Sequence, residues 1–162
     1  MTLEVGALAW HFALLGIDGR EYHLPRSIGG QPAVLVFFKT TCGTCDLAFP
    51  YINRLVEVYE KGWHLWAISQ DPPDRSTEYA RSHGISYPVL LDAPAYAVSR
   101  LYDPPATPTL FLVDRRGRVA YTTAGFSKDD LNELSRLLAI EIGASPALIA
   151  PAGDGKPEFK PG

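Results

Sequence analysis

The segment around the only two cysteines of this chain is Val34-Leu-Val-Phe-Phe-Lys-Thr-Thr-Cys-Gly-Thr-Cys-Asp-Leu-Ala-Phe-Pro50. An apolar run rich in β-branched and aromatic residues ends at Phe38, which favours a strand covered on both faces. After Cys45 the apolar residues recur at helical spacing. The cysteine pair therefore lies where a strand passes into a helix, with Cys42 at the start of that helix.

This position favours a reactive thiol at Cys42. Unpaired backbone N–H groups and the helix dipole favour negative charge at a helix N-terminus, and the thiolate is the reactive form of cysteine. Cys45 follows three residues later, and residues three apart share one helix face. The two sulfurs can therefore meet and close a short disulfide, which predicts a reversible dithiol–disulfide couple.

Two other interpretations of the pair are a passive buried pair and half of a zinc site. Zinc needs two further ligands, and the chain has neither a second C-x-x-C nor histidines at a ligand spacing. The four histidines are His11, His23, His64 and His83. Redox chemistry is the preferred interpretation, and we expect neither a bound metal nor a cofactor.

Length and composition predict one globular domain. The 162 residues are 46% hydrophobic and 20% charged, within the usual range for such proteins. A net charge of −3 with scattered basic residues argues against a nucleic-acid partner. No run approaches the roughly 18 apolar residues of a membrane span, and no leader pattern is visible. We expect a cytoplasmic monomer, or an exported or membrane-tethered protein if a leader has been removed.

Strands alternate with helices along most of the chain, which implies a mostly parallel sheet with helices on both faces. A hairpin around Asp114–Gly117 adds an antiparallel edge, and Asp18-Gly19 marks the turn of an earlier hairpin. Strands are expected at 12–15, 22–24, 33–38, 63–69, 88–91, 109–113 and 118–122. Helices are expected at 43–61, 75–83, 94–101 and 128–142.

Caps and composition set the expected ends of these elements. Gly62 suits the C-terminal cap of the first long helix, and Ser127-Lys-Asp-Asp130 resembles a capping box at the start of the last one. Residues 143–162 are rich in proline and glycine and poor in large apolar residues. We therefore expect a domain of residues 1–142 and an extended tail of residues 143–162 with little structure.

Taken together, these features resemble the thioredoxin superfamily. A strand, C-x-x-C, a helix containing Pro50 and a late Ala106-Thr-Pro-Thr109 before a hairpin follow the superfamily's order. The opening of the chain and an extra β-α unit at 74–92 resemble the TlpA-like and redoxin branch, which is related to the AhpC/TSA proteins. The resemblance covers about residues 5–141.

This resemblance implies a thioredoxin-like α/β fold and a function. The fold would be a central mixed, mostly parallel sheet flanked by helices, with an N-terminal hairpin extension at about 5–26 and an inserted β-α unit. The function would be thiol–disulfide oxidoreduction on disulfide- or dithiol-containing proteins, with an unidentified redox partner that recycles the couple. Cys42 would attack and Cys45 would resolve the mixed disulfide. Thr107 and Pro108 match the superfamily's cis-proline site, where the backbone of Thr107 would pair with an extended substrate chain.

The chain departs from the superfamily at the acid that serves the second cysteine. Val36 and Ala48 occupy the two positions where related proteins carry such an acid. Lys39 and Asp71 are candidate electrostatic modulators of the couple. A solvated lysine and a turn-capping aspartate are the ordinary alternatives for these two side chains.

A thiol peroxidase of the peroxiredoxin type, with antioxidant activity, is the alternative function. That family needs a proline and a threonine seven and three positions before its attacking cysteine, where this chain has Leu35 and Lys39. Its usual arginine before the hairpin strand is replaced by Thr107-Pro108. A copper-delivery protein would need C-x-x-x-C and a later histidine, and none follows His83.

Overall fold

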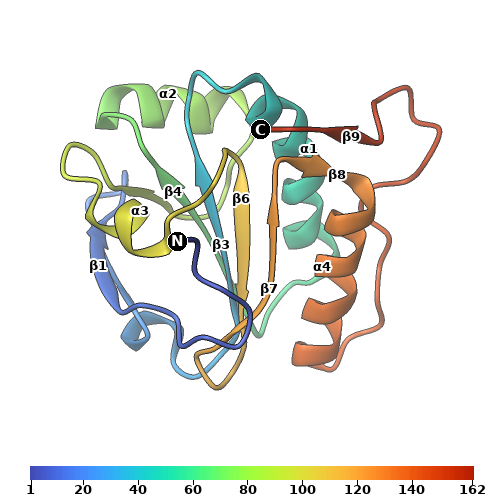
Figure 1. The fold of residues 1–162 in the computed structure, drawn as a ribbon, viewed down its shortest axis with the longest axis horizontal. Helices are drawn as coiled ribbons and strands as arrows, with labels where there is room; N and C mark the ends of the chain where they lie inside the picture. Colours follow the sequence, from blue (N-terminus) through green and yellow to red (C-terminus); the bar gives the residue numbers. More distant parts are fainter.

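A five-stranded mixed sheet forms the centre of the computed structural model, which describes residues 1–162 (Figure 1). The central strand pairs parallel with one neighbour and antiparallel with the other. In spatial order the strands are β5 (Val89–Leu91), β4 (His64–Ser69), β3 (Ala33–Phe38), β6 (Thr109–Val113) and β7 (Val119–Ala124). The mixed sheet that the resemblance predicts is therefore present.

Every residue of β3 is buried, as its continuous apolar run predicts. Alternate side chains of β3 enter two separate clusters, because successive residues of a strand point to opposite faces. One face is covered by α1 (Gly43–Val58), α2 (Pro73–Ser82) and α4 (Lys128–Ile142), and the other by α3 (Ala97–Tyr102) and the N-terminal segment. None of these four α-helices combines the length and the hydrophobicity that a transmembrane segment requires.

The N-terminal hairpin extension packs on the second face. It consists of β1 (Phe12–Leu15) and β2 (Glu21–Leu24), followed by the short 3₁₀ helix η1 (Arg26–Ile28). Phe12 and Tyr22 meet the ring of Trp66 edge-on, at centroid distances of 6.2 and 5.5 Å. These aromatic contacts fix the hairpin against the sheet.

Several predicted boundaries are wrong by a few residues. Helix α1 ends at Val58 rather than near Gly62, because Tyr59 leaves the helix with φ −122° and turns its ring into the core. There its hydroxyl lies 2.8 Å from Oγ of Ser135. Helix α2 begins at Pro73, two residues earlier than predicted, since proline suits the first helical turn. Helix α3 begins three residues later than predicted, at Ala97.

One half of the capping box predicted for the last helix is confirmed, and the other half is not, because the Asp130 carboxylate accepts from the Thr123 hydroxyl at 2.8 Å. Ser127 is the N-cap of α4, and its side chain accepts a hydrogen bond from the Asp130 backbone N–H at 3.1 Å. Ser127 also belongs to the short strand β8 (Phe126–Ser127), which pairs antiparallel with β9 (Phe159–Lys160). The residues that precede α4 therefore pair with β9 near the end of the chain.

Residues 143–162 are held along the domain by hydrogen bonds, contrary to the expectation of a tail with little structure, although residues 152–162 are exposed. Ile149 and Ala150 are buried. The side chain of Asn132 bonds both of their backbone N–H groups and the carbonyl of Ala150. Arg54 of α1 adds a bond to the Ile149 carbonyl at 2.7 Å, and the composition of the segment did not reveal these partners. Independent folding of residues 1–142 stays a prediction.

Candidate active site

Cys42 is the N-cap of α1, as the sequence predicts. Its sulfur accepts a hydrogen bond from the Cys45 backbone N–H at 3.1 Å, and its backbone carbonyl accepts from the Asp46 N–H at 3.1 Å. An N–H group directed at the sulfur from the first helical turn stabilises negative charge there. The side chain is half-buried, so a thiolate at Cys42 is reachable from solvent.

Cys45 lies one turn inside α1 and is fully buried. Burial is the main cause that raises the pKa of its thiol, and the hydrogen bond with the Cys42 sulfur raises it further. The backbone N–H of Lys39 acts in the opposite direction. Both cysteines are free thiols in the structure. Burial therefore distinguishes the two sulfurs, because Cys45 is fully buried and Cys42 is only half-buried.

The loop before β6 brings Thr107 against Cys42. The Cys42 thiol donates to the Thr107 carbonyl at 3.2 Å. The peptide bond between Thr107 and Pro108 is cis. The Pro108 carbonyl accepts from the Gly125 N–H at 2.8 Å, which ties this loop to the turn after β7. The structure thus brings together Cys42, Cys45 and the Thr107–Pro108 pair, although Cys42 and Thr107 are 65 residues apart in sequence.

Lys39 and Asp71 take other positions. The Asp71 carboxylate accepts from the Thr40 N–H at 2.7 Å and lies 3.9 Å from a guanidinium nitrogen of Arg75. It therefore shapes the loop that precedes Cys42. The Lys39 side chain is exposed and lines a separate polar cavity with Gln70. Action of either charge on the couple stays a prediction.

A cluster of Asp46, Tyr79 and His83 beside the site was not predicted. The Tyr79 hydroxyl donates to Oδ1 of Asp46 at 2.8 Å, and Nε2 of His83 lies 3.2 Å from the same oxygen. The Tyr79 and His83 rings stack with centroids 3.8 Å apart. Burial and the Asp46 carboxylate raise the pKa of Tyr79. No spacing in the sequence predicts this cluster, although Asp46 directly follows Cys45.

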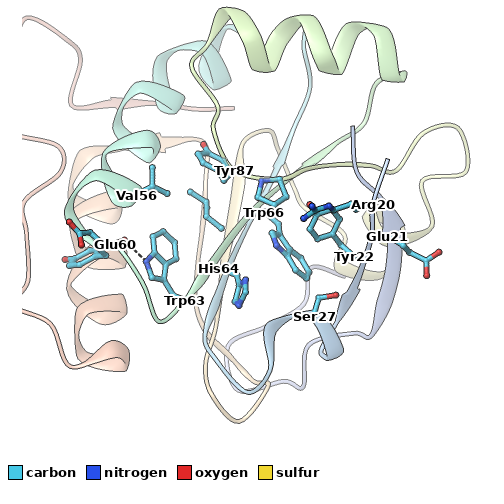
Figure 2. Close-up of a pocket in the computed structure, with 13 residues that line it drawn as sticks. Arg20, Glu21, Tyr22, Ser27, Val56, Glu60, Trp63, His64, Trp66 and Tyr87 are labelled. Atoms are coloured by element: carbon cyan, nitrogen blue, oxygen red, sulfur yellow. Dashed lines mark hydrogen bonds between the residues drawn. The ribbon is translucent and has the colours of Figure 1, made fainter. Parts of the chain in front are cut away.

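An aromatic cavity of about 340 Å³ lies near the far end of α1 (Figure 2). Trp63 and Trp66 of the β4 region and Tyr22 of the hairpin line it, together with His64 and Tyr87. The Trp63 indole N–H donates to the Tyr59 carbonyl at 2.9 Å. The cavity contains no cysteine, so it is a separate region from the thiol site. Nowhere in the molecule do three or more His, Cys, Asp or Glu side chains gather as metal ligands.

Comparison with known proteins places these residues in context. Residues 5–122 match the model of the AhpC/TSA family. A relative described as thiol-disulfide oxidoreductase ResA, from Geobacillus thermodenitrificans (strain NG80-2), is 31% identical over 140 residues, 82% of this chain and 76% of the relative. A relative of the same description from Geobacillus kaustophilus (strain HTA426) is 31% identical over 133 residues, 80% of this chain and 75% of the relative.

Solved structures agree with this picture. A putative thiol:disulfide interchange protein DsbE from Chlorobium tepidum has a TM-score of 0.79 and 29% identity, covering 88% of this chain and all of that one. A putative protein disulfide isomerase from Bacteroides thetaiotaomicron has a TM-score of 0.79 at 23% identity, over 88% of this chain and 95% of that one, and supports the fold alone. The thioredoxin-like fold predicted from the sequence is confirmed.

Proposed function

We propose that Cys42 attacks the disulfides of other proteins and that Cys45 resolves the mixed disulfide. The chain belongs to the AhpC/TSA family and is a thiol–disulfide oxidoreductase. The observation that carries this assignment is the contrast between the two sulfurs. Cys42 is half-buried at the helix N-terminus and accepts an N–H bond, whereas Cys45 is fully buried. The attacking sulfur needs access to the substrate and a donor that stabilises negative charge, and of the two sulfurs only Cys42 is accessible and accepts a bond from a helix N–H.

The first step of the reaction forms a mixed disulfide. The Cys42 thiolate attacks one sulfur of the substrate disulfide, a new S–S bond forms, and the other substrate sulfur leaves as a thiolate. Cys45 then gives up its proton and attacks Sγ of Cys42, which releases the second substrate sulfur. Two electrons pass from the Cys42–Cys45 dithiol to the substrate, and the protein keeps an internal disulfide. The same steps run backwards when an oxidised protein meets a dithiol.

The buried position of Cys45 supports a resolving role. Its raised pKa keeps it protonated in the resting dithiol, so it does not compete with Cys42 for the first attack. No carboxylate occupies the two positions at which the superfamily carries an acid, Val36 and Ala48. Its proton therefore leaves through water, through the departing substrate thiolate or through a residue at another position.

Thr107 supports the choice of proteins as substrates. Its carbonyl is already in contact with the Cys42 sulfur, so a chain that lies along the loop of Thr107 and Pro108 presents its disulfide to Cys42. Backbone pairing with such a chain is the general way in which a protein edge binds extended peptides. We propose a monomer whose partners are a disulfide-containing protein and a separate dithiol or disulfide partner that recycles the couple.

The compartment sets the direction of the reaction. In a cytoplasm kept reduced by thiol systems, as the sequence predicts for this chain, the couple would act as a reductant. In an oxidising compartment the couple would form disulfides if its reduction potential is high, and would reduce substrates if its potential is low and a dithiol partner recycles it. Fractionation of cells that express a tagged chain, followed by trapping of the two thiols, would assign both the location and the resting state.

Direct transfer to a protein disulfide tests the proposed function. The reduced protein is mixed with insulin as a disulfide-bonded test substrate, and the free thiols of both proteins are followed by alkylation and mass spectrometry. We expect Cys42 and Cys45 to be lost together for each substrate disulfide that is reduced. A protein that keeps both thiols while the substrate disulfides persist, at any ratio of the two, contradicts the proposal.

A further inference from the structure

Residues 159–162 lie beside the start of α1, at the end of the strand β9 (Figure 1). The Thr44 hydroxyl donates to the Pro161 carbonyl at 3.0 Å. Thr44 stands between the two cysteines and is only 5% exposed. The final segment therefore covers part of the C-x-x-C turn itself.

Gly162 lies directly beside the loop that holds Thr107. A Cβ atom added at Gly162 would be 2.6 Å from the Thr107 carbonyl oxygen, which is the same oxygen that accepts from the Cys42 thiol. Gly125 leaves room from the other side: with φ +75°, a Cβ atom there would be 2.9 Å from the Gly162 nitrogen and 3.0 Å from the Lys160 carbonyl oxygen. Backbone thus packs on backbone, which glycine alone permits.

A buried lysine anchors the segment that leads to this contact. Lys128, at the first position of α4, is 1% exposed. Its ammonium bonds the Pro151 carbonyl at 3.0 Å, Oδ1 of Asp154 at 2.6 Å and the Lys156 carbonyl at 3.3 Å. A buried ammonium with partners for all its donors fixes the chain around it. The segment from residue 151 onwards is therefore directed towards β8 and the site.

We propose that residues 159–162, here called the strap, take the place of an extended substrate chain and so determine which disulfides reach Cys42. The strap has the two features such a chain needs. It is an extended segment with backbone pairing to β8, and it contacts the backbone of Thr107. The inference rests on the proposed function, because it concerns substrates of the same sulfur.

The strap selects by the length of chain around the disulfide. A disulfide with a long flanking chain must displace the strap from Thr44 and Thr107 before it can lie along the loop. A small disulfide reaches the half-buried sulfur of Cys42 without taking that place. When the strap is closed most of the time, the apparent affinity for an extended substrate falls by the fraction of molecules that are open.

A truncation after Glu158 tests this selection. The reduced protein and the truncated protein are each mixed with a disulfide-linked peptide dimer and with bis(2-hydroxyethyl) disulfide. If about a tenth of the molecules are open, the truncation raises the rate constant for the peptide about tenfold and changes that for the small disulfide less than about twofold. An unchanged ratio of the two rate constants overturns the proposal. A lower ratio also overturns it, since the strap would then be part of the substrate site.

A point variant covers the case in which the truncated protein does not fold. Thr44→Val removes the hydroxyl that holds Pro161 and keeps the side-chain shape. Thr77→Val is the matched control, because Thr77 bonds a backbone carbonyl of its own helix on the exposed side of α2. We expect Thr44→Val to raise the peptide-to-small ratio and Thr77→Val to leave it unchanged. Equal ratios for the two variants contradict the proposal.

Chemical labelling separates a failure of the strap from a failure of the proposed function. The reduced full chain and the truncated chain are labelled with N-ethylmaleimide and with a maleimide on a polyethylene glycol chain, and labelling of Cys42 is measured. We expect the truncation to speed the bulky reagent more than the small one, even for a protein that transfers no electrons to disulfides. Equal acceleration, or none, overturns the strap whatever the exchange assay shows.

Discussion

The thiol site and the aromatic cavity lie near opposite ends of α1. The first turn of the helix begins beside Cys42, and its last turn reaches the cavity at Val56. The cavity is lined by large rings such as Trp63 and Trp66, yet it holds no cysteine (Figure 2). The thiol site is partly covered by residues 159–162, and it contains both sulfurs.

This difference teaches that a large aromatic cavity does not by itself locate the chemistry of this molecule. Helix dipoles and free N–H groups act at a helix N-terminus, where Cys42 lies, and the opposite end of the helix offers carbonyl groups instead. The cavity offers apolar contact, whereas the site offers charge stabilisation for sulfur. Changes at the two ends of α1 should therefore have different consequences.

The largest expected effect is the loss of Cys42. Cys42→Ser should lower disulfide exchange by at least about a thousandfold, because it removes the attacking sulfur. Trp63→Phe, which keeps an aromatic ring in the cavity, should leave the rate of disulfide exchange within about twofold of the parent protein. Stopped-flow measurement with a protein disulfide checks both variants. Comparable losses in the two variants would break the distinction between the two regions.

The next effect concerns the second sulfur. Cys45→Ser should accumulate a mixed disulfide between Cys42 and the substrate and lower turnover about a hundredfold, because no second thiol remains to release the substrate. Non-reducing gels and peptide mapping identify the trapped bond. If Cys42→Ser traps substrate through Cys45 and the converse variant does not, the roles of the two cysteines are reversed.

Peroxide should be a poorer substrate than a protein disulfide by at least about tenfold. Peroxide reduction needs donors that stabilise charge on the departing oxygen, and Leu35 and Lys39 stand where the peroxidase family uses proline and threonine. Stopped-flow oxidation of the reduced protein by hydrogen peroxide and by a disulfide-bonded protein gives the two rate constants. A larger constant for peroxide would assign the site to the peroxidase reaction instead.

Alkaline pH should destabilise the reduced protein through Cys45. Burial raises the pKa of this thiol in the folded state above the ~8.5 of an unfolded chain. The folded state then binds more protons at high pH, so stability is full below about pH 8.5 and falls above it. Between pH 8 and 9.5 the loss should be about 1 kcal/mol. The free energy of unfolding, measured with urea at each pH, should fall less steeply with rising pH in Cys45→Ala. An equal pH dependence in the two proteins would refute the assignment.

The smallest effect has the opposite sign and belongs to the cavity. Burial lowers the pKa of His64 in the folded state below its ordinary value near 6.5. The unfolded state then binds more protons in acid, so stability is full above about pH 6.5 and decreases as pH falls below it. Urea unfolding between pH 7 and 5 should show this loss in the parent protein and a reduced loss in His64→Gln. If the free energy of unfolding falls equally in both proteins between pH 7 and 5, His64 is not the cause of the loss.

The sequence predicted the parts of the molecule in which pattern and packing agree. The uninterrupted apolar run of β3 and the C-x-x-C spacing were sufficient to place the site between a strand and a helix. The end of α1 was missed because a single tertiary contact, the Tyr59 hydroxyl with Ser135, outweighs the local preference for a glycine cap.

Long-range polar contacts account for the features that the sequence did not predict. The tail was expected to lack structure because its composition is poor in apolar residues, yet Lys128 and Asn132 hold it by hydrogen bonds to its backbone. Asp46 meets Tyr79 from a different helix, and no spacing in the sequence encodes that meeting. Composition describes how much apolar surface a segment can bury, but not which single side chains will satisfy its backbone.

Counting thiols is the most direct test of a reversible Cys42–Cys45 couple. The protein is oxidised, divided, and alkylated with and without prior reduction, and mass spectrometry counts the modified thiols. We predict no alkylated thiol in the oxidised sample, two in the reduced sample, and a peptide that contains both cysteines joined by one S–S bond. Two freely alkylated thiols under every oxidising condition would contradict the account.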